Sequence, residues 1–155
     1  MLGCGDMQRF TLLAIILVLA FLGLADSWYL AQAALSDTAL SCGIEALDQC
    51  NTVAQSEYSR LFGIPLAVYG VAFYVLFFVF AAVMLAVTKP VLTRILYWAS
   101  VIGFLASLYF LYLQVFVIKA LCVYCLASFA LSVLLFLIVW RLKTREFVIS
   151  HSVIP

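Results

Sequence analysis

Cysteines are the most reactive side chains of this sequence, and four of its five fall into two pairs. Cys122 and Cys125 form a C-x-x-C, whereas seven residues separate Cys42 from Cys50. Spacing of i, i+3 on a helix places two sulfurs on one face, so Cys122 and Cys125 can bond to each other. Two disulfide-capable pairs, one in a polar loop and one at the start of an apolar helix, suffice to relay electrons by thiol–disulfide exchange.

The same four cysteines also fit two arrangements that do no redox chemistry. One is a pair of static disulfides that staple the loop, and the other is a single zinc site. Zinc sites commonly use C-x(2–4)-C pairs, and the gap between Cys42 and Cys50 departs from that spacing. Four cysteines allow three pairings, so the sequence leaves the connectivity open. We expect Cys4, the fifth cysteine, to be incidental.

The composition indicates that a membrane, not water, surrounds the chain. Hydrophobic residues make up 68% of the 155 residues and charged residues only 10%, against about half and a quarter in soluble domains. The net charge of +1 and the scattered basic residues exclude a nucleic-acid-binding surface. A chain of this length has room for one helical membrane domain, so we expect any soluble partner to be a separate chain.

Long apolar runs predict an all-α integral membrane protein, a bundle of four transmembrane helices. The helices are expected at about 10–35, 64–88, 95–117 and 120–140. Together they form a single domain over residues 1–146, with an outer loop at about 36–62 and a C-terminal tail at 147–155. Lys89-Pro90 and Lys119 are expected to mark the tight turns on either side of the third helix.

Basic residues near the helix ends predict the orientation in the membrane. With the N-terminus in the cytoplasm, only Arg60 and Lys119 lie outside. Six basic residues then lie inside: Arg9, Lys89, Arg94, Arg141, Lys143 and Arg145. We therefore expect a plasma (inner) membrane protein with both termini cytoplasmic and both cysteine pairs on the outer side, where disulfides persist.

Two features of the first span have alternative interpretations. Asp26 is its only charge, and it fits a functional acid, a structural hydrogen bond or an interfacial position. Ala31-Gln32-Ala33 has the form of a signal-peptidase site, but Asp26 and Trp28-Tyr29 separate it from the apolar core, so we expect a retained helix.

The C-x-x-C is expected in the first turn of the fourth helix, where the helix dipole and unpaired N–H groups favour a thiolate. Cys125 lies six residues past Lys119, which corresponds to about 9 Å along a helix and places it near the headgroup boundary. A lipid-soluble oxidant can reach a cysteine at that depth.

Several segments, in this order, resemble the vitamin K epoxide reductase family, in particular its stand-alone bacterial and archaeal members. The resemblance covers most of the chain and rests on Gly23-Leu24-Ala25-Asp26-Ser27-Trp28-Tyr29-Leu30, Cys42 to Cys50 with Asn51-Thr52-Val53, Ser56-Glu57-Tyr58-Ser59, Phe62-Gly63-Ile64-Pro65-Leu66-Ala67, Tyr69-Gly70, and Cys122-Val123-Tyr124-Cys125-Leu126-Ala127-Ser128.

The resemblance implies a four-helix bundle around a quinone that enters from the membrane, with ubiquinone, menaquinone or a similar quinone as electron acceptor. It implies that Cys42 takes electrons from a partner protein and that Cys50 passes them on through a disulfide with Cys122. Cys125, released by that step, would be the cysteine that reacts with the quinone.

Three further residues are expected to support the site. Ser56 lies where family members place a serine near the active site, although a helix-capping role fits equally. Phe129 stands where the animal enzyme has a tyrosine, so it offers no phenolic hydrogen bond, and Ser128 can supply a weaker one.

The expected activity is oxidation of a separate, exported thioredoxin-like protein with electrons passed to a membrane quinone, which supports disulfide-bond formation. One alternative is reduction of a quinone or quinone epoxide of the vitamin K type. Another is a non-catalytic membrane scaffold whose disulfides only stabilise the outer loop, in which case losing one lowers stability by a few kcal/mol and changes no reaction.

Overall fold

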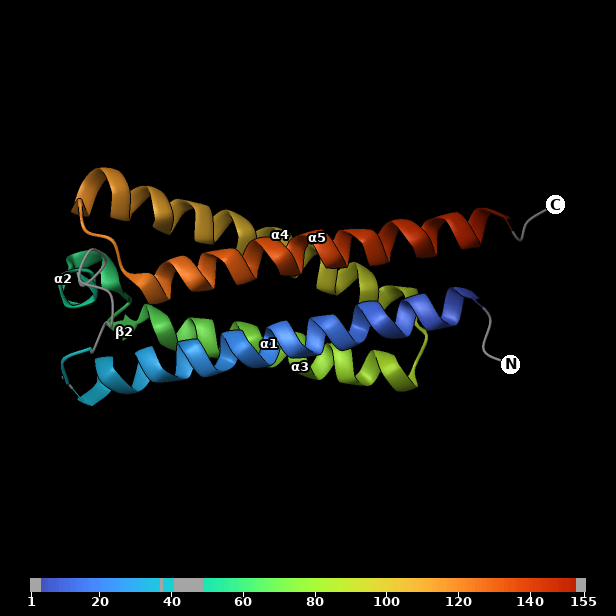
Figure 1. The fold of residues 1–155 in the computed structure, drawn as a ribbon, viewed down its shortest axis with the longest axis horizontal. Helices are drawn as coiled ribbons and strands as arrows, with labels where there is room; N and C mark the ends of the chain where they lie inside the picture. The colour runs from blue at the N-terminus through green and yellow to red at the C-terminus, as the bar shows by residue number, and fades with distance from the viewer. Residues whose placement is uncertain (1–3, 37, 41–48, 153–155) are drawn as a thin grey trace.

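Four long helices run side by side as a bundle in the computed structural model, which describes residues 4–36, 38–40 and 49–152 (Figure 1). They are α1 (Cys4–Ser36), α3 (Leu66–Ala86), α4 (Pro90–Tyr112) and α5 (Val123–Ser152), and a π-helical segment, Leu113–Ile118, continues α4. Segments of all four are long and apolar enough to cross a membrane: Met7–Ser36, Leu66–Ala86, Pro90–Ile118 and Val123–Arg145. The expected all-α, multi-pass membrane fold is confirmed.

The ends of three helices differ from the expected positions. α1 begins at Cys4, before the expected start at about residue 10. α4 begins at Pro90, about five residues early, because proline suits the first helical position, where its missing N–H costs nothing. α5 begins at Val123, after Cys122, and continues to Ser152. Residues 147–152, expected in a tail, are therefore helical, because no glycine or proline interrupts the chain between Leu126 and Pro155.

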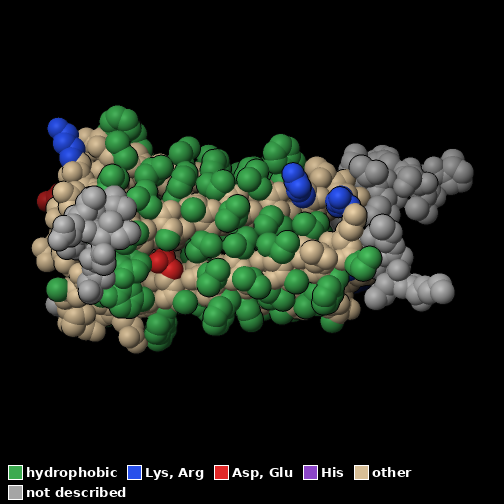
Figure 2. Space-filling view, in the orientation of Figure 1, with side chains coloured by type: hydrophobic (Ala, Val, Ile, Leu, Met, Phe, Trp, Pro, Cys, Tyr) green, Lys and Arg blue, Asp and Glu red, His purple; other side chains and the backbone are tan. Residues whose placement is uncertain are grey.

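The core lies along the bundle axis, where α1 packs on α3 and α5, and α4 packs mainly on α5. Its fully buried side chains are Leu13, Ile16, Ala20, Tyr74, Phe77, Ala81, Met84, Leu96, Leu135, Val139 and Leu142. Hydrophobic side chains also cover the outside along the length of the molecule, and Lys and Arg gather near its two ends (Figure 2). A band of apolar surface bounded by basic residues is the pattern that a bilayer requires.

The segment between α1 and α3 contains structure that the sequence analysis did not predict. It holds the short helix α2 (Cys50–Ala54), a 3₁₀ turn (Glu57–Ser59) and the antiparallel strands β1 (Arg60–Leu61) and β2 (Ile64–Pro65). Phe62 and Gly63 join the strands with φ angles of 52° and 80°, the left-handed conformation that two-residue hairpin turns favour. This segment lies at the end of the bundle opposite both chain termini (Figure 1).

Candidate redox site

Cys122 is the residue immediately before α5, and Cys125 lies in the first turn of that helix. Lys119 reverses the chain with a left-handed conformation, φ 56°. Buried Gln114, in the π-helical segment, then holds the connection: its backbone oxygen accepts the N–H of Ala120 (3.1 Å), and its side-chain Oε1 accepts the N–H of Cys122 (3.2 Å). One polar side chain thus fixes the entrance of the C-x-x-C into the helix.

Because Cys122 lies at the start of α5, its sulfur accepts hydrogen bonds from groups in the first turn of that helix. The Cys125 thiol donates a hydrogen bond to it, which lowers the pKa of Cys122 to about 7, while burial opposes this effect. The backbone N–H groups of Cys125 and Tyr124 also point at this sulfur and lower the pKa further. The lowered pKa is in line with a thiolate at the helix start, and it points to Cys122 as the residue that carries the charge.

The reactivity of Cys122 is expected to follow this lowered pKa. Because the thiolate is the reactive form, the rate of Cys122 alkylation should rise with pH around a midpoint near 7. Cys125→Ala removes the largest cause and should move the midpoint toward the ordinary thiol value of 9.0. Cys125→Ser keeps a hydroxyl donor and serves as the matched control. The measurement is alkylation by a small uncharged reagent at several pH values, localised by mass spectrometry; equal midpoints in wild type and Cys125→Ala would contradict the assignment.

Cys50 begins α2 and is fully buried, with 0% of its surface exposed. It shares a buried cluster with Cys122, Ala33 and Leu40. Cys50 thus lies at the end of the polar outer loop expected from the sequence, but its side chain is buried and not in contact with water. Cys42, the other cysteine of that loop, lies outside the described residues.

Two amide side chains hold α2 against the rest of the bundle. The backbone N–H of Leu121 donates to Gln49 Oε1 (3.2 Å), which links the residue before Cys50 to the residue before Cys122. Asn51 makes a two-point contact with Leu40: its Oδ1 accepts the backbone N–H (2.8 Å), and its Nδ2 donates to the backbone oxygen (3.2 Å). These bonds explain why Cys50 is held beside the C-x-x-C.

The cysteines of the site are in different redox states. Cys50 is in a disulfide, whereas Cys122 and Cys125 are free thiols. Within the described part of the chain, no three His, Cys, Asp or Glu side chains gather as a metal site requires.

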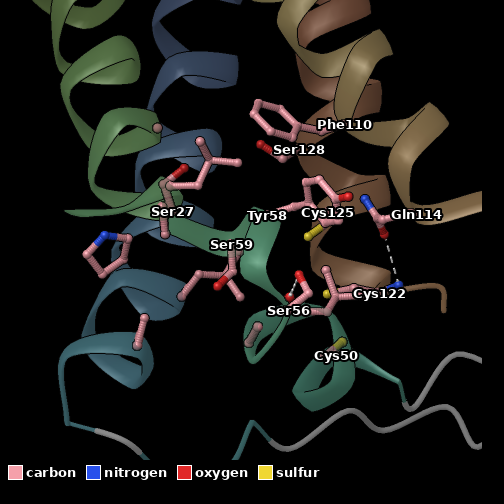
Figure 3. Close-up of a pocket in the computed structure, with 18 of the residues that line it drawn as sticks. Ser27, Cys50, Ser56, Tyr58, Ser59, Phe110, Gln114, Cys122, Cys125 and Ser128 are labelled. Carbon is pink, nitrogen blue, oxygen red and sulfur yellow. Dashed lines mark hydrogen bonds between the residues drawn. The ribbon is translucent and has the colours of Figure 1, made fainter. Parts of the chain in front are cut away.

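A cavity of about 1050 Å³ lies next to these sulfurs, between the outer segment and the helices. Figure 3 shows Cys50 on α2 at one end, Cys122 and Cys125 on the α5 side, and Ser128 and Phe110 farther into the bundle. The cavity is lined by Cys50, Cys122 and Cys125, and by all three residues predicted to support the site, Ser56, Ser128 and Phe129. The structure brings these six together; their roles remain predictions.

Ser56 does not use its side chain as a helix cap. It precedes the 3₁₀ turn, but its hydroxyl donates to the backbone oxygen of Val53 in α2 (2.7 Å). Ser56 therefore ties α2 to the turn that follows, at the edge of the cavity.

Among the polar residues of the cavity that sequence reasoning missed are Tyr74 and Gln114. Both are buried, and both sit in apolar stretches that looked like ordinary membrane helix. A polar group inside such a stretch is itself a signal, because it needs a partner there. Of the aromatic residues in the third span, Phe110 lines the cavity, whereas Trp98, Tyr109, Tyr112 and Phe116 are exposed on the outside.

Asp26 lies on α1 outside this cavity lining. Its Oδ2 atom is buried and has no hydrogen-bond partner among the residues that the structure describes.

Comparison with known protein families matches residues 14–140 to the vitamin K epoxide reductase family. This match extends from α1 to the last turns of the membrane span of α5 and includes every cysteine of the site. The chain belongs to the vitamin K epoxide reductase family. Membership confirms the resemblance drawn from the sequence motifs and accounts for the four apolar helices. The proteins of this family are quinone-linked oxidoreductases, so the chain is an oxidoreductase of a membrane.

Proposed function

We propose that this member of the vitamin K epoxide reductase family oxidises a thioredoxin-like protein and passes the electrons to a membrane quinone. One observation carries the proposal: a disulfide-bonded Cys50 and the free thiols of Cys122 and Cys125 line one cavity. Cys50 and Cys122 are neighbours in a buried cluster, so disulfide exchange between them needs no large movement.

The electron path begins when the partner's dithiol reduces a disulfide between Cys42 and Cys50. The Cys50 thiolate attacks Cys122 in a Cys122–Cys125 disulfide, which forms a Cys50–Cys122 disulfide and releases Cys125 as a thiolate. Cys42 then attacks Cys50, restores the loop disulfide and frees Cys122. When Cys122 bonds to Cys125 again, two electrons leave the sulfurs for the quinone, which also takes up two protons. The redox states in the structure match the stage just before this last step.

The lowered pKa of Cys122 suits both of its reactions. A thiolate is a good leaving group when Cys42 attacks Cys50, and it is also the nucleophile that closes the bond to Cys125. Cys125 is only partly buried and lies within the membrane-spanning part of α5, on the cavity wall. A quinone is flat and apolar with two oxygen acceptors, and a largely apolar cavity with a few hydroxyls suits such a molecule.

The partner and the orientation follow from the same path. The thioredoxin-like protein is a separate exported protein that approaches the end of the bundle formed by α2 and the hairpin. Both termini lie at the opposite end (Figure 1), which we place in the cytoplasm of a cell whose plasma membrane holds the protein. Arg60 and Lys119 are the basic residues at the outer end.

The test is quinone reduction by the purified protein in lipid, with a reduced thioredoxin-like protein as electron donor and short-tailed ubiquinone and menaquinone analogues as acceptors. We expect turnover in wild type and in the control Cys4→Ala, and turnover at the uncatalysed rate in Cys50→Ala and Cys122→Ala. Wild-type turnover that persists in Cys50→Ala would disprove the path through Cys50. No turnover in wild type, with the Cys50 disulfide resistant to the donor, would favour a structural role.

A further inference from the structure

A chain of hydroxyl groups crosses the membrane bundle on the wall of the cavity. Tyr74 of α3, Ser107 of α4, and Ser128 and Ser132 of α5 all line the cavity. The Ser107 hydroxyl donates to Ser132 Oγ (3.0 Å), and the Ser132 hydroxyl donates to the backbone oxygen of Ser128 (2.9 Å). The Tyr74 hydroxyl contacts both the backbone oxygen (3.2 Å) and the Oγ (3.0 Å) of Ser128. Polar groups inside a membrane bundle are costly and mark functional sites.

Tyr74 reaches Ser128 only because α1 leaves room for its ring. The side chain is 1% exposed and belongs to the central core. Gly23 of α1 faces it, and a Cβ atom at position 23 would overlap the ring. The absence of a side chain at Gly23 therefore leaves a gap, here called the slot, that the Tyr74 ring fills. Through this gap the Tyr74 hydroxyl reaches α5.

The hydrogen bonds of Tyr74 allow its proton to be given to a ligand without leaving a buried group unpaired. If the phenol turns toward the cavity, the backbone oxygen of Ser128 still accepts the Ser132 hydroxyl. The phenol oxygen still has the Ser128 hydroxyl, since either atom of that pair can be the donor. The usual cost of breaking a buried hydrogen bond is thereby largely avoided.

We propose that the Tyr74 hydroxyl, whose oxygen accepts the Ser128 hydroxyl, donates a hydrogen bond to one carbonyl oxygen of the quinone. This inference rests on the proposed function. Ser128 follows Cys125 by three residues, so both lie on one face of α5. A quinone oxygen held by Tyr74 next to Ser128 therefore places the quinone ring beside Cys125. The Tyr74 hydroxyl also stabilises the negative charge that develops on this oxygen as electrons arrive, and the Ser128 hydroxyl strengthens that bond by donating to the phenol oxygen. Phe129, which also lines the cavity, offers only an apolar ring.

The experiment measures binding and reduction of the short-tailed ubiquinone analogue by Tyr74→Phe, which keeps the ring and removes only the hydroxyl. We expect binding or turnover to fall about 10- to 100-fold, as for loss of one hydrogen bond to a charged group. Gly23→Ala should reproduce this loss with Tyr74 present, because it closes the slot. If Tyr74 and Ser128 act as one unit, the double variant Tyr74→Phe with Ser128→Ala should lose less turnover than the product of the two single fold-losses.

The matched control is Ser100→Ala. Ser100 is equally buried in α4, but its hydroxyl bonds locally to the backbone oxygen of Tyr97 (2.7 Å), and it does not line the cavity. Its quinone binding and turnover should equal those of wild type. The value of kcat/KM for the thioredoxin-like protein should be the same in all variants, because it reports only the first half of the reaction; a general structural defect would lower it.

The outcomes separate the two proposals. Wild-type turnover with unchanged binding and rate in Tyr74→Phe would overturn the subsite and leave the proposed function standing. A different result is that wild type binds the analogue but shows no turnover, and that Tyr74→Phe binds it more weakly. That result would support the subsite and contradict the electron path. Absence of analogue binding to wild type would overturn the subsite.

Discussion

Removing Cys42 and Cys125 together is expected to convert the protein quantitatively to a Cys50–Cys122 disulfide under mild oxidation. In the proposed cycle this bond would be resolved by Cys42 on one side and Cys125 on the other. The variant Cys42→Ala with Cys125→Ala, in a Cys4→Ala background, contains no third thiol and therefore traps the bond. Quinone reduction should be lost completely, because Cys122 has no partner left with which to pass on electrons.

The structural basis is the contact between two chain segments far apart in the sequence. Cys50 and Cys122 are 0% and 1% exposed and lie in the same buried cluster. The bond between Gln49 and the N–H of Leu121 holds their neighbours together. A pair positioned in this way should oxidise far faster than two cysteines that meet only by chance collision.

The measurement is mass-spectrometric mapping of non-reduced peptides after oxidation. The matched control, Cys42→Ala with Cys122→Ala in the same background, keeps Cys50 and Cys125 and should form much less of the internal disulfide. Equal yields of the two disulfides would show that the cluster does not select Cys122, and the proposed order of exchange would have to be abandoned.

Replacing Asn51 by leucine is expected to expose Cys50. Asn51 satisfies both backbone groups of Leu40, a residue only 6% exposed. Each buried polar group left unpaired costs about 1–3 kcal/mol, and 1.4 kcal/mol is a factor of ten in an opening equilibrium. The two groups together cost at least about 2 kcal/mol, so the Cys50 disulfide should be reduced by a water-soluble phosphine about 30-fold faster than in wild type, or more.

Two further variants make this result interpretable. Asn51→Asp keeps an acceptor for the Leu40 N–H but cannot donate to the Leu40 oxygen when ionised, so its effect should be intermediate. Thr52→Ala changes the next, exposed residue of α2 and should leave the rate unchanged. If Asn51→Leu is reduced at the wild-type rate, some other contact keeps Cys50 buried.

Features that depend on local sequence were predicted well. Apolar runs gave the four membrane helices, because a bilayer acts on each segment of about 20 residues independently. The motifs around Cys50, Pro65 and Cys122 indicated the family that the comparison confirmed. The C-x-x-C was also placed correctly at a helix start, since helix starts depend on the next few residues. The predicted helix ends were less accurate. α4 begins earlier than predicted, at Pro90, and α5 continues for several polar turns after Trp140.

The sequence by itself determined that the protein lies in a membrane, that it has four long helices and that a C-x-x-C stands at the start of the last one. Each of these features depends on residues that are close together in the chain. Only the tertiary structure decided that Cys50 is buried beside Cys122 and that Tyr74 passes Gly23 to reach Ser128. It also placed Gln49 and Gln114 as acceptors for the segment that leads into the C-x-x-C. These contacts join residues from different helices, and their partners are fixed by how the helices pack, which no local pattern records.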